Sequence, residues 1–127
     1  MILLITGVTL WCVVHFIPTL ATGFKQSLIE MIGLRPYKIL FALLIFASLG
    51  LIIVGWNSVE PVDLYDPPEW GVHANNVLMI IAIFLLVSSD RKSMARRVLR
   101  HPMLTGLSVW GMAHLLANGD QRSVIVF

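Results

Sequence analysis

Four long stretches of the chain contain no lysine, arginine, aspartate or glutamate. They are residues 1–24, 39–59, 70–89 and 101–119. Each is close to the length of about 20 apolar residues that an α-helix needs to cross the hydrocarbon core of a bilayer. Lipid offers no hydrogen-bond partners to the backbone, so such runs are expected to be helical. The pattern therefore predicts an all-α integral membrane bundle with four transmembrane helices.

The charged residues lie mainly in three blocks between these stretches, and the blocks alternate in sign. Three cations and one carboxylate give residues 25–38 a net charge of +2, and four carboxylates give residues 60–69 a net charge of −4. Five cations and one carboxylate give residues 90–100 a net charge of +4. Lysine and arginine are enriched in cytoplasmic loops. We therefore expect a multi-pass protein of a bacterial inner membrane, with loops 25–38 and 90–100 cytoplasmic and loop 60–69 and both termini on the opposite side.

Composition supports this interpretation. Hydrophobic residues make up 57% of the 127 residues and charged residues only 13%, against about 25% charged in an average soluble domain. These values exclude a disordered chain, a nucleic-acid-binding domain and an ordinary cytosolic enzyme, so the expected partner is the lipid bilayer and not a nucleic acid. A single cysteine, Cys12, excludes a disulfide framework and a cysteine-based zinc site.

Prolines and glycines predict where the helices begin, end and pack. The proline-rich segment 61–68 cannot be helical and is expected to form an ordered loop, with the next helix starting near residues 67–70. Pro18 predicts a kink and Pro102 a helix start. Residues 122–127 resemble the start of a fifth helix. Small residues that allow close helix packing occur in the second and fourth stretches: Gly50, Gly55, Gly106, Gly111 and Ala113.

All four histidines lie inside the charge-free stretches. His73 and His101 lie near the ends of their stretches, whereas His15 and His114 lie roughly 13 and 20 Å above the predicted inner boundary at about 1.5 Å per residue. Ionisable groups inside membrane spans often mark function. Two neutral imidazoles from different helices are what the iron of a b-type haem accepts. The alternative is that each imidazole bonds to a neighbouring carbonyl or to a hydroxyl group.

A motif in the last charge-free stretch resembles the signature of the NnrU family of membrane proteins. It begins with Arg100, His101, Pro102 and Gly106 and continues through Trp110, Ala113, His114 and the run to Gly119. The resemblance also includes His15, Arg35, Tyr37 and the segment 67–70, so residues 1–127 are expected to form one NnrU-like transmembrane domain. Members of the family usually continue through at least one more helix.

The resemblance implies an association with nitrite and nitric oxide reduction, that is, with denitrification. The family is also similar to the plastid zeta-carotene isomerase, a membrane enzyme with a haem b. Carried over by position, His15 and His114 would be the haem ligands and so the metal ligands, in an isomerase-like or redox-related protein. That enzyme has a cysteine three residues before its second histidine, whereas this chain has Gly111. A ligand switch through that sulfur is therefore not expected.

Two other functions remain open. The protein could be a small non-catalytic accessory subunit that packs against a larger energy-transducing membrane complex. It could also be a relative of the isoprenylcysteine-type methyltransferases, in which Arg100, His101 and Pro102 would hold S-adenosylmethionine. That group's later acidic pair is missing here. The substrate and the catalytic residues are not identified by the sequence.

The second basic block is expected to contact anionic lipid headgroups or an anionic partner, each cation contributing about 1 kcal/mol near a membrane surface. The residues concerned are Arg91, Lys92, Arg96, Arg97 and Arg100. The spans contain no carboxylate, which argues against a proton or ion pathway.

Overall fold

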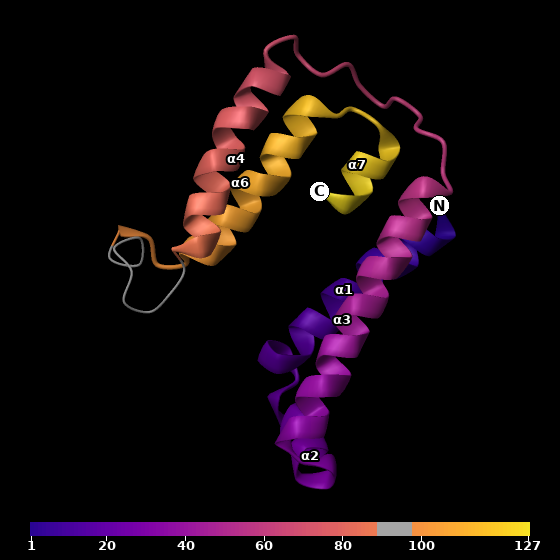
Figure 1. Cartoon of the computed structure of the whole chain (residues 1–127), viewed down its shortest axis with the longest axis vertical. Helices are drawn as coiled ribbons and strands as arrows, with labels where there is room; N and C mark the ends of the chain where they lie inside the picture. Colours follow the sequence, from indigo (N-terminus) through magenta and orange to yellow (C-terminus); the bar gives the residue numbers. More distant parts are fainter. Residues whose placement is uncertain (89–97) are drawn as a thin grey trace. The chain divides into compact units, whose positions relative to one another are not determined.

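The computed structural model describes residues 1–88 and 98–127, and within these ranges it contains helices and no strand (Figure 1). The helices are α1 (Ile2–Leu20), α2 (Thr22–Ile32), α3 (Leu34–Asn57), α4 (Gly71–Val87), α6 (Pro102–Ala117) and α7 (Gln121–Val126). The chain forms two compact units, Met1–Glu60 and Pro61–Phe127. The all-α prediction is confirmed, and a helix occurs in each of the four charge-free stretches.

Two helices are long and apolar enough to cross a membrane. They are α1, with 19 residues, and α3, with 24 residues, whereas the apolar helix α4 has 17 residues and α6 has 16. Large apolar side chains of α3 are exposed, among them Phe46 at 70% and Leu43 at 61%. The core helix of a soluble protein would bury such side chains. A lipid environment is therefore plausible for these helices, and the prediction of a membrane protein is supported to that extent.

Most of residues 25–38, which were expected as a loop connecting two helices, is helical. Helix α2 covers residues 22–32, and α3 begins at Leu34. The turn between them is at Gly33, whose φ of 88° is a conformation that glycine adopts without steric cost. Charged residues predict contact with water. A helix on the water side of a bilayer can also contain charged residues. The charged residues of segment 25–38 are therefore compatible with the helices found there.

Helices α1 and α3 pack against each other through small residues. Gly7 of α1 is buried, and a Cβ atom built there would lie 2.8 Å from the backbone nitrogen of Ile52. Gly55 of α3 is buried against the backbone of Leu3 and Leu4, and Leu4 is fully buried. The pair is thus held at a distance that leaves no room for side chains at two of its contact points.

In the second unit, α4 and α6 lie side by side (Figure 1). Ala82 and Leu85 of α4 and Ala113 of α6 are buried. Pro102 is the first residue of α6, as predicted, since a missing N–H costs nothing in a first turn. Helix α4 begins at Gly71, directly after the segment in which its start was expected.

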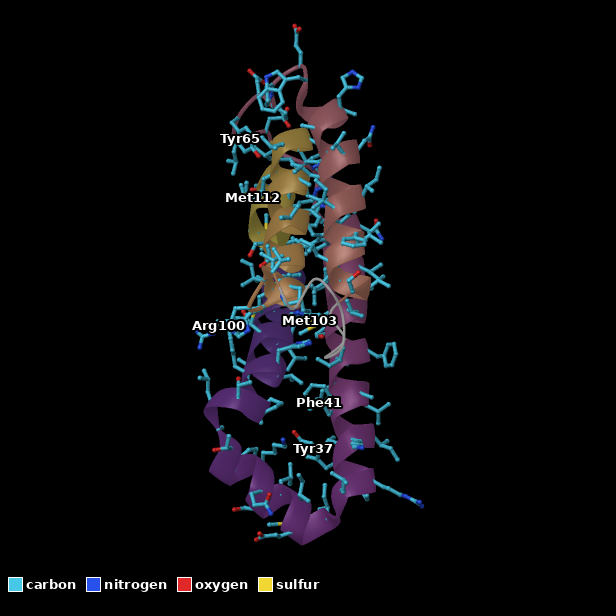
Figure 2. All side chains as sticks on the ribbon, turned by 90° about the vertical axis from the view of Figure 1, so that its left-hand side faces the viewer. Tyr37, Phe41, Tyr65, Arg100, Met103 and Met112 are labelled. Carbon is cyan, nitrogen blue, oxygen red and sulfur yellow. The ribbon has the colours of Figure 1, made fainter. Side chains whose placement is uncertain are left out.

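The acidic loop is ordered by contacts with the segment that follows α6. The amide of Leu64 donates to the carbonyl of Gly119 at 2.8 Å, and the amide of Gln121 donates to the carbonyl of Val62 at 2.9 Å. The hydroxyl of Tyr65, which Figure 2 labels, donates to the carbonyls of Leu115 and, at 2.8 Å, Asn118. The prediction of an ordered loop is confirmed.

The short helix α7 begins where the start of a fifth helix was expected. Asp120 caps it: one carboxylate oxygen accepts hydrogen bonds from the amides of Arg122 at 3.0 Å and Ser123 at 3.2 Å. The other carboxylate oxygen accepts from the Ser123 hydroxyl at 2.7 Å. Burial raises the pKa of Asp120, but the hydrogen bonds from Ser123 and Arg122 outweigh this effect, so its pKa lies below the ordinary 3.8.

Replacing Asp120 with alanine is expected to lower the free energy of unfolding by about 1 kcal/mol, because the first turn of α7 loses its cap. The difference from the wild type should be full above pH 4 and shrink as the pH falls through the lowered pKa of Asp120, since protonation removes the charge that these hydrogen bonds stabilise. Thermal unfolding in detergent at several pH values measures it. Asp120→Asn, which keeps an acceptor oxygen, should lose much less at neutral pH. Equal losses in the two variants would contradict the capping role.

Candidate functional site: two histidines held by tryptophan carbonyls

His15 and His114 have the same local geometry in two different helices. In each case Nδ1 lies 2.8 Å from the backbone carbonyl oxygen of a tryptophan four residues earlier, Trp11 or Trp110. The ring centroids of tryptophan and histidine are 4.3 Å apart in the first pair and 4.9 Å in the second. Residues four apart lie on the same face of a helix, which brings the two rings together.

This hydrogen bond assigns the tautomer of each neutral imidazole. A carbonyl oxygen only accepts, so Nδ1 carries the proton and Nε2 keeps its lone pair. Nε2 of both histidines has no hydrogen-bond partner among residues 1–88 and 98–127. Histidines that bind metals commonly donate their other ring N–H to a carbonyl in this way, which fixes the ring and makes the free nitrogen more basic. The structure thus orients both rings as a ligand needs.

The surroundings of the two histidines differ. His15 is exposed on α1, and its ring contacts Phe41 of α3 edge-on, with centroids 6.1 Å apart. His114 is half-buried on α6, and its ring stacks on Phe127 at 4.2 Å with an interplanar angle of 16°. His15 belongs to the first compact unit and His114 to the second. Their joint action on one ligand therefore stays a prediction.

Gly111 of α6 lies three residues before His114. It is buried, and a Cβ atom there would lie 3.0 Å from the carbonyl oxygen of Phe127. The carbonyl oxygen of Phe127 therefore leaves little room for a side chain at residue 111.

The motif at the start of α6 has a clear structural role in two of its four positions. Pro102 and Gly106 are buried, and a Cβ atom on Gly106 would lie 3.0 Å from Cβ of Leu85 and 3.1 Å from the carbonyl oxygen of Ala82. Arg100, labelled in Figure 2, is exposed, and so is His101. Helix initiation and helix packing account for Pro102 and Gly106 without a bound cofactor.

Four of the five cations expected to contact lipid headgroups or a partner lie outside the described residues: Arg91, Lys92, Arg96 and Arg97. Within the described part of the chain, no group of three or more histidine, cysteine or acidic side chains is placed to hold a metal ion. A haem needs only two axial nitrogens and brings its own equatorial ligands, so this finding concerns multidentate metal sites alone.

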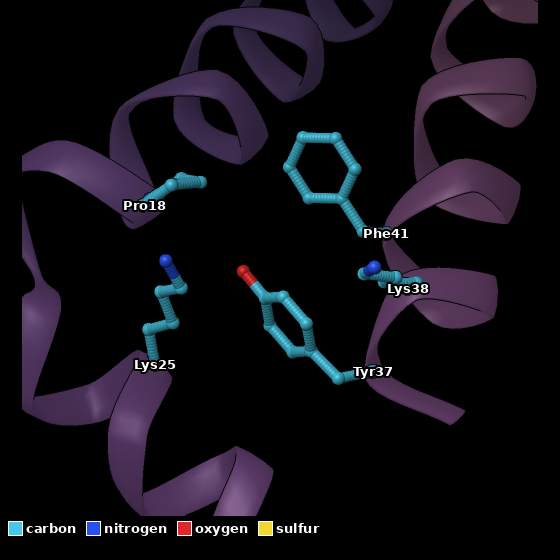
Figure 3. Close-up of a pocket in the computed structure, with 5 residues that line it drawn as sticks. All are labelled: Pro18, Lys25, Tyr37, Lys38 and Phe41. Carbon is cyan, nitrogen blue, oxygen red and sulfur yellow. The ribbon is translucent and has the colours of Figure 1, made fainter. Parts of the chain in front are cut away.

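The structure contains two cavities that the sequence analysis did not predict. One, with a volume of about 180 Å³, lies where α1, α2 and α3 meet and is lined by Pro18, Lys25, Tyr37, Lys38 and Phe41 (Figure 3). The other is an open apolar groove of about 530 Å³, lined by Trp70, His73, Ala74, Val77, Leu78 and Leu116. In the sequence, Tyr37 is identified only by its place in the family pattern. No periodicity in the sequence identifies a cavity at a helix junction.

Comparison with known proteins agrees with the motif. The model of the family described as NnrU protein matches residues 3–127 and so spans both compact units. No curated protein and no solved structure matches the chain. With this match over nearly its whole length, the chain belongs to the NnrU family.

Proposed function

We propose that this NnrU protein binds haem b in the membrane, with Nε2 of His15 and Nε2 of His114 as axial ligands. The observation that carries the proposal is the repeated bond from each Nδ1 to a tryptophan carbonyl, which leaves each Nε2 with a lone pair and without a partner in the described chain. Neutral imidazole nitrogens are common haem ligands, so the donor set fits the group.

In this proposal the chain supplies orientation and a low-polarity environment. The carbonyls of Trp11 and Trp110 hold the two imidazoles in one tautomer, and the neighbouring aromatic rings restrict their rotation. Bound haem would supply an iron centre for one-electron chemistry. His15 and His114 would hold the group, and the proposal covers a redox-related or an isomerase-like role.

The proposal includes a four-span topology with the two basic blocks on the cytoplasmic side. Helices α4 and α6 support it, since both lie in charge-free stretches and pack along each other as an antiparallel pair would. The net charges of residues 25–38, 60–69 and 90–100 support the sidedness.

An absorption spectrum of the detergent-purified full chain, expressed with added haem precursor, tests the ligand assignment. The wild type is expected to show a Soret band, and His15→Ala and His114→Ala should each abolish it, because each removes one axial nitrogen. His73→Ala is the matched control, since His73 is an exposed histidine on α4. It should keep the band.

Helical content by circular dichroism shows whether each variant is folded. A wild type that stays colourless after haem reconstitution, or a full Soret band in either ligand variant, would refute the proposal.

The accessory-subunit hypothesis is the second candidate, and the exposed apolar side chains of α6 favour it. Met103, Leu104 and Leu107, which lie on one side of the helix, are each more than half exposed. A partner helix could cover this face as well as lipid could. A colourless protein that co-purifies in constant ratio with a larger membrane complex would favour this function over haem binding.

A further inference from the structure

The pocket where α1, α2 and α3 meet combines positive charge with apolar walls. Lys25 of α2 and Lys38 of α3 supply two ammonium groups, and no carboxylate lines it. Pro18 of α1 and Phe41 of α3 form the apolar side (Figure 3). A pocket of this composition fits an anionic group that is attached to an apolar body.

Tyr37 gives independent evidence for a missing hydrogen-bond acceptor. Its side chain is only 9% exposed, and its buried hydroxyl has no hydrogen-bond partner in the described chain. Figure 3 shows this hydroxyl pointing into the pocket, toward Lys25 and Pro18. Buried hydroxyl groups are nearly always hydrogen-bonded, because an unpaired one destabilises the fold. Lysine ammonium groups only donate, so neither Lys25 nor Lys38 can accept the phenol proton.

The pocket lies at one end of the two helices that are long enough to span a membrane. Pro18 is in the last turn of α1, and Lys38 is the last charged residue before the charge-free stretch of α3. In a bilayer this is the level at which phosphate headgroups meet acyl chains. The volume of about 180 Å³ is below the 300–1,000 Å³ of a site for a whole drug-sized ligand, so it fits a headgroup fragment.

We propose that this pocket binds the phosphate of an anionic phospholipid. Lys25, Lys38 and the Tyr37 hydroxyl donate to the phosphate oxygens, and Phe41 and Pro18 contact the glycerol and the first methylene groups. The site does not depend on haem binding. The same phosphate chemistry could come from free inorganic phosphate, so the experiment separates the two sources.

Binding of short-chain phosphatidylglycerol to the full chain in neutral detergent, measured by native mass spectrometry, tests the site. The double variant Lys25→Gln/Lys38→Gln should bind well over tenfold more weakly, and Tyr37→Phe about tenfold more weakly, since one hydrogen bond to a charged group contributes at least about a factor of ten. Arg35→Gln is the matched control: it removes one positive charge from the same turn of α3, from an exposed residue that does not line the pocket. It should change binding less than twofold.

Inorganic phosphate and short-chain phosphatidylcholine are the competing ligands. The proposal predicts that neither displaces phosphatidylglycerol at equal concentration. Displacement by inorganic phosphate would assign the pocket to a soluble anion and overturn the lipid assignment. Unchanged phosphatidylglycerol binding in the double variant, or an equal loss in Arg35→Gln, would overturn the site itself. Circular dichroism and thermal unfolding of each variant separate loss of binding from loss of folding.

Discussion

Replacing Gly55 with alanine is expected to destabilise the α1–α3 pair by about 3 kcal/mol, the upper part of the range for overpacking a close contact. The added Cβ atom would lie 2.7 Å from Cα of Leu4 and 2.9 Å from the carbonyl carbon of Leu3. Both are backbone atoms of α1 and cannot rotate away as a flexible side chain could. The two helices would have to move apart along a contact that also buries Leu4.

The control for this prediction is Gly50→Ala in the same helix. No atom lies within 4 Å of a Cβ built at Gly50. Alanine favours a helix over glycine by up to about 1 kcal/mol, so this variant should be as stable as the wild type or slightly more stable. Thermal or denaturant-induced unfolding in detergent, followed by circular dichroism, compares the three proteins. Equal stability of the two variants would show that the close α1–α3 contact is wrong.

Replacing Gly119 with alanine is expected to detach the acidic loop from the end of α6, at a cost of roughly 3 kcal/mol or more from overpacking and lost hydrogen bonds. A Cβ atom at Gly119 would overlap the carbonyl oxygen of Tyr65 and lie 3.1 Å from Cδ of Pro67. The Gly119 carbonyl also accepts hydrogen bonds from the amides of Leu64 and Tyr65, at 2.8 and 3.3 Å. Relieving the overlap would break these bonds together.

Hydrogen exchange of residues 62–65, combined with thermal unfolding, measures this effect. The amides of Leu64 and Tyr65 should lose their protection in Gly119→Ala. Gly23→Ala makes the same chemical change at a helical position with open space. It should leave the exchange of residues 62–65 unchanged and the thermal stability equal or slightly higher. Tyr65→Phe removes only the phenol hydrogen bonds to Leu115 and Asn118 and should cost about 1 kcal/mol. Protected amides in Gly119→Ala would contradict the proposed role of this glycine.

The two tryptophan–histidine pairs could have been derived from the sequence, because their geometry is local. Residues four apart face the same side of a helix, and the carbonyl that Nδ1 reaches belongs to that same helix. The four-residue spacing of Trp11 from His15 and of Trp110 from His114 is therefore sufficient to predict both contacts. The stacking of His114 on Phe127 was not predictable in this way, since it depends on the turn at Asp120 that brings α7 back toward α6.

The sequence alone determined the apolar helices, the proline-rich loop between α3 and α4, the start of α6 at Pro102 and the family. Each of these follows from charge, hydropathy or backbone restriction at neighbouring positions. Only the tertiary structure decided at which small residues two helices come into close contact. The sequence gives Gly50 and Gly55 the same predicted role in helix packing. In the structure, Gly55 contacts α1 and Gly50 faces open space. The pocket at Tyr37 depends in the same way on how three helices meet at Ala21 and Gly33. Close approach and cavities are properties of which helices pair and at what distance, and no local pattern along one helix contains that information.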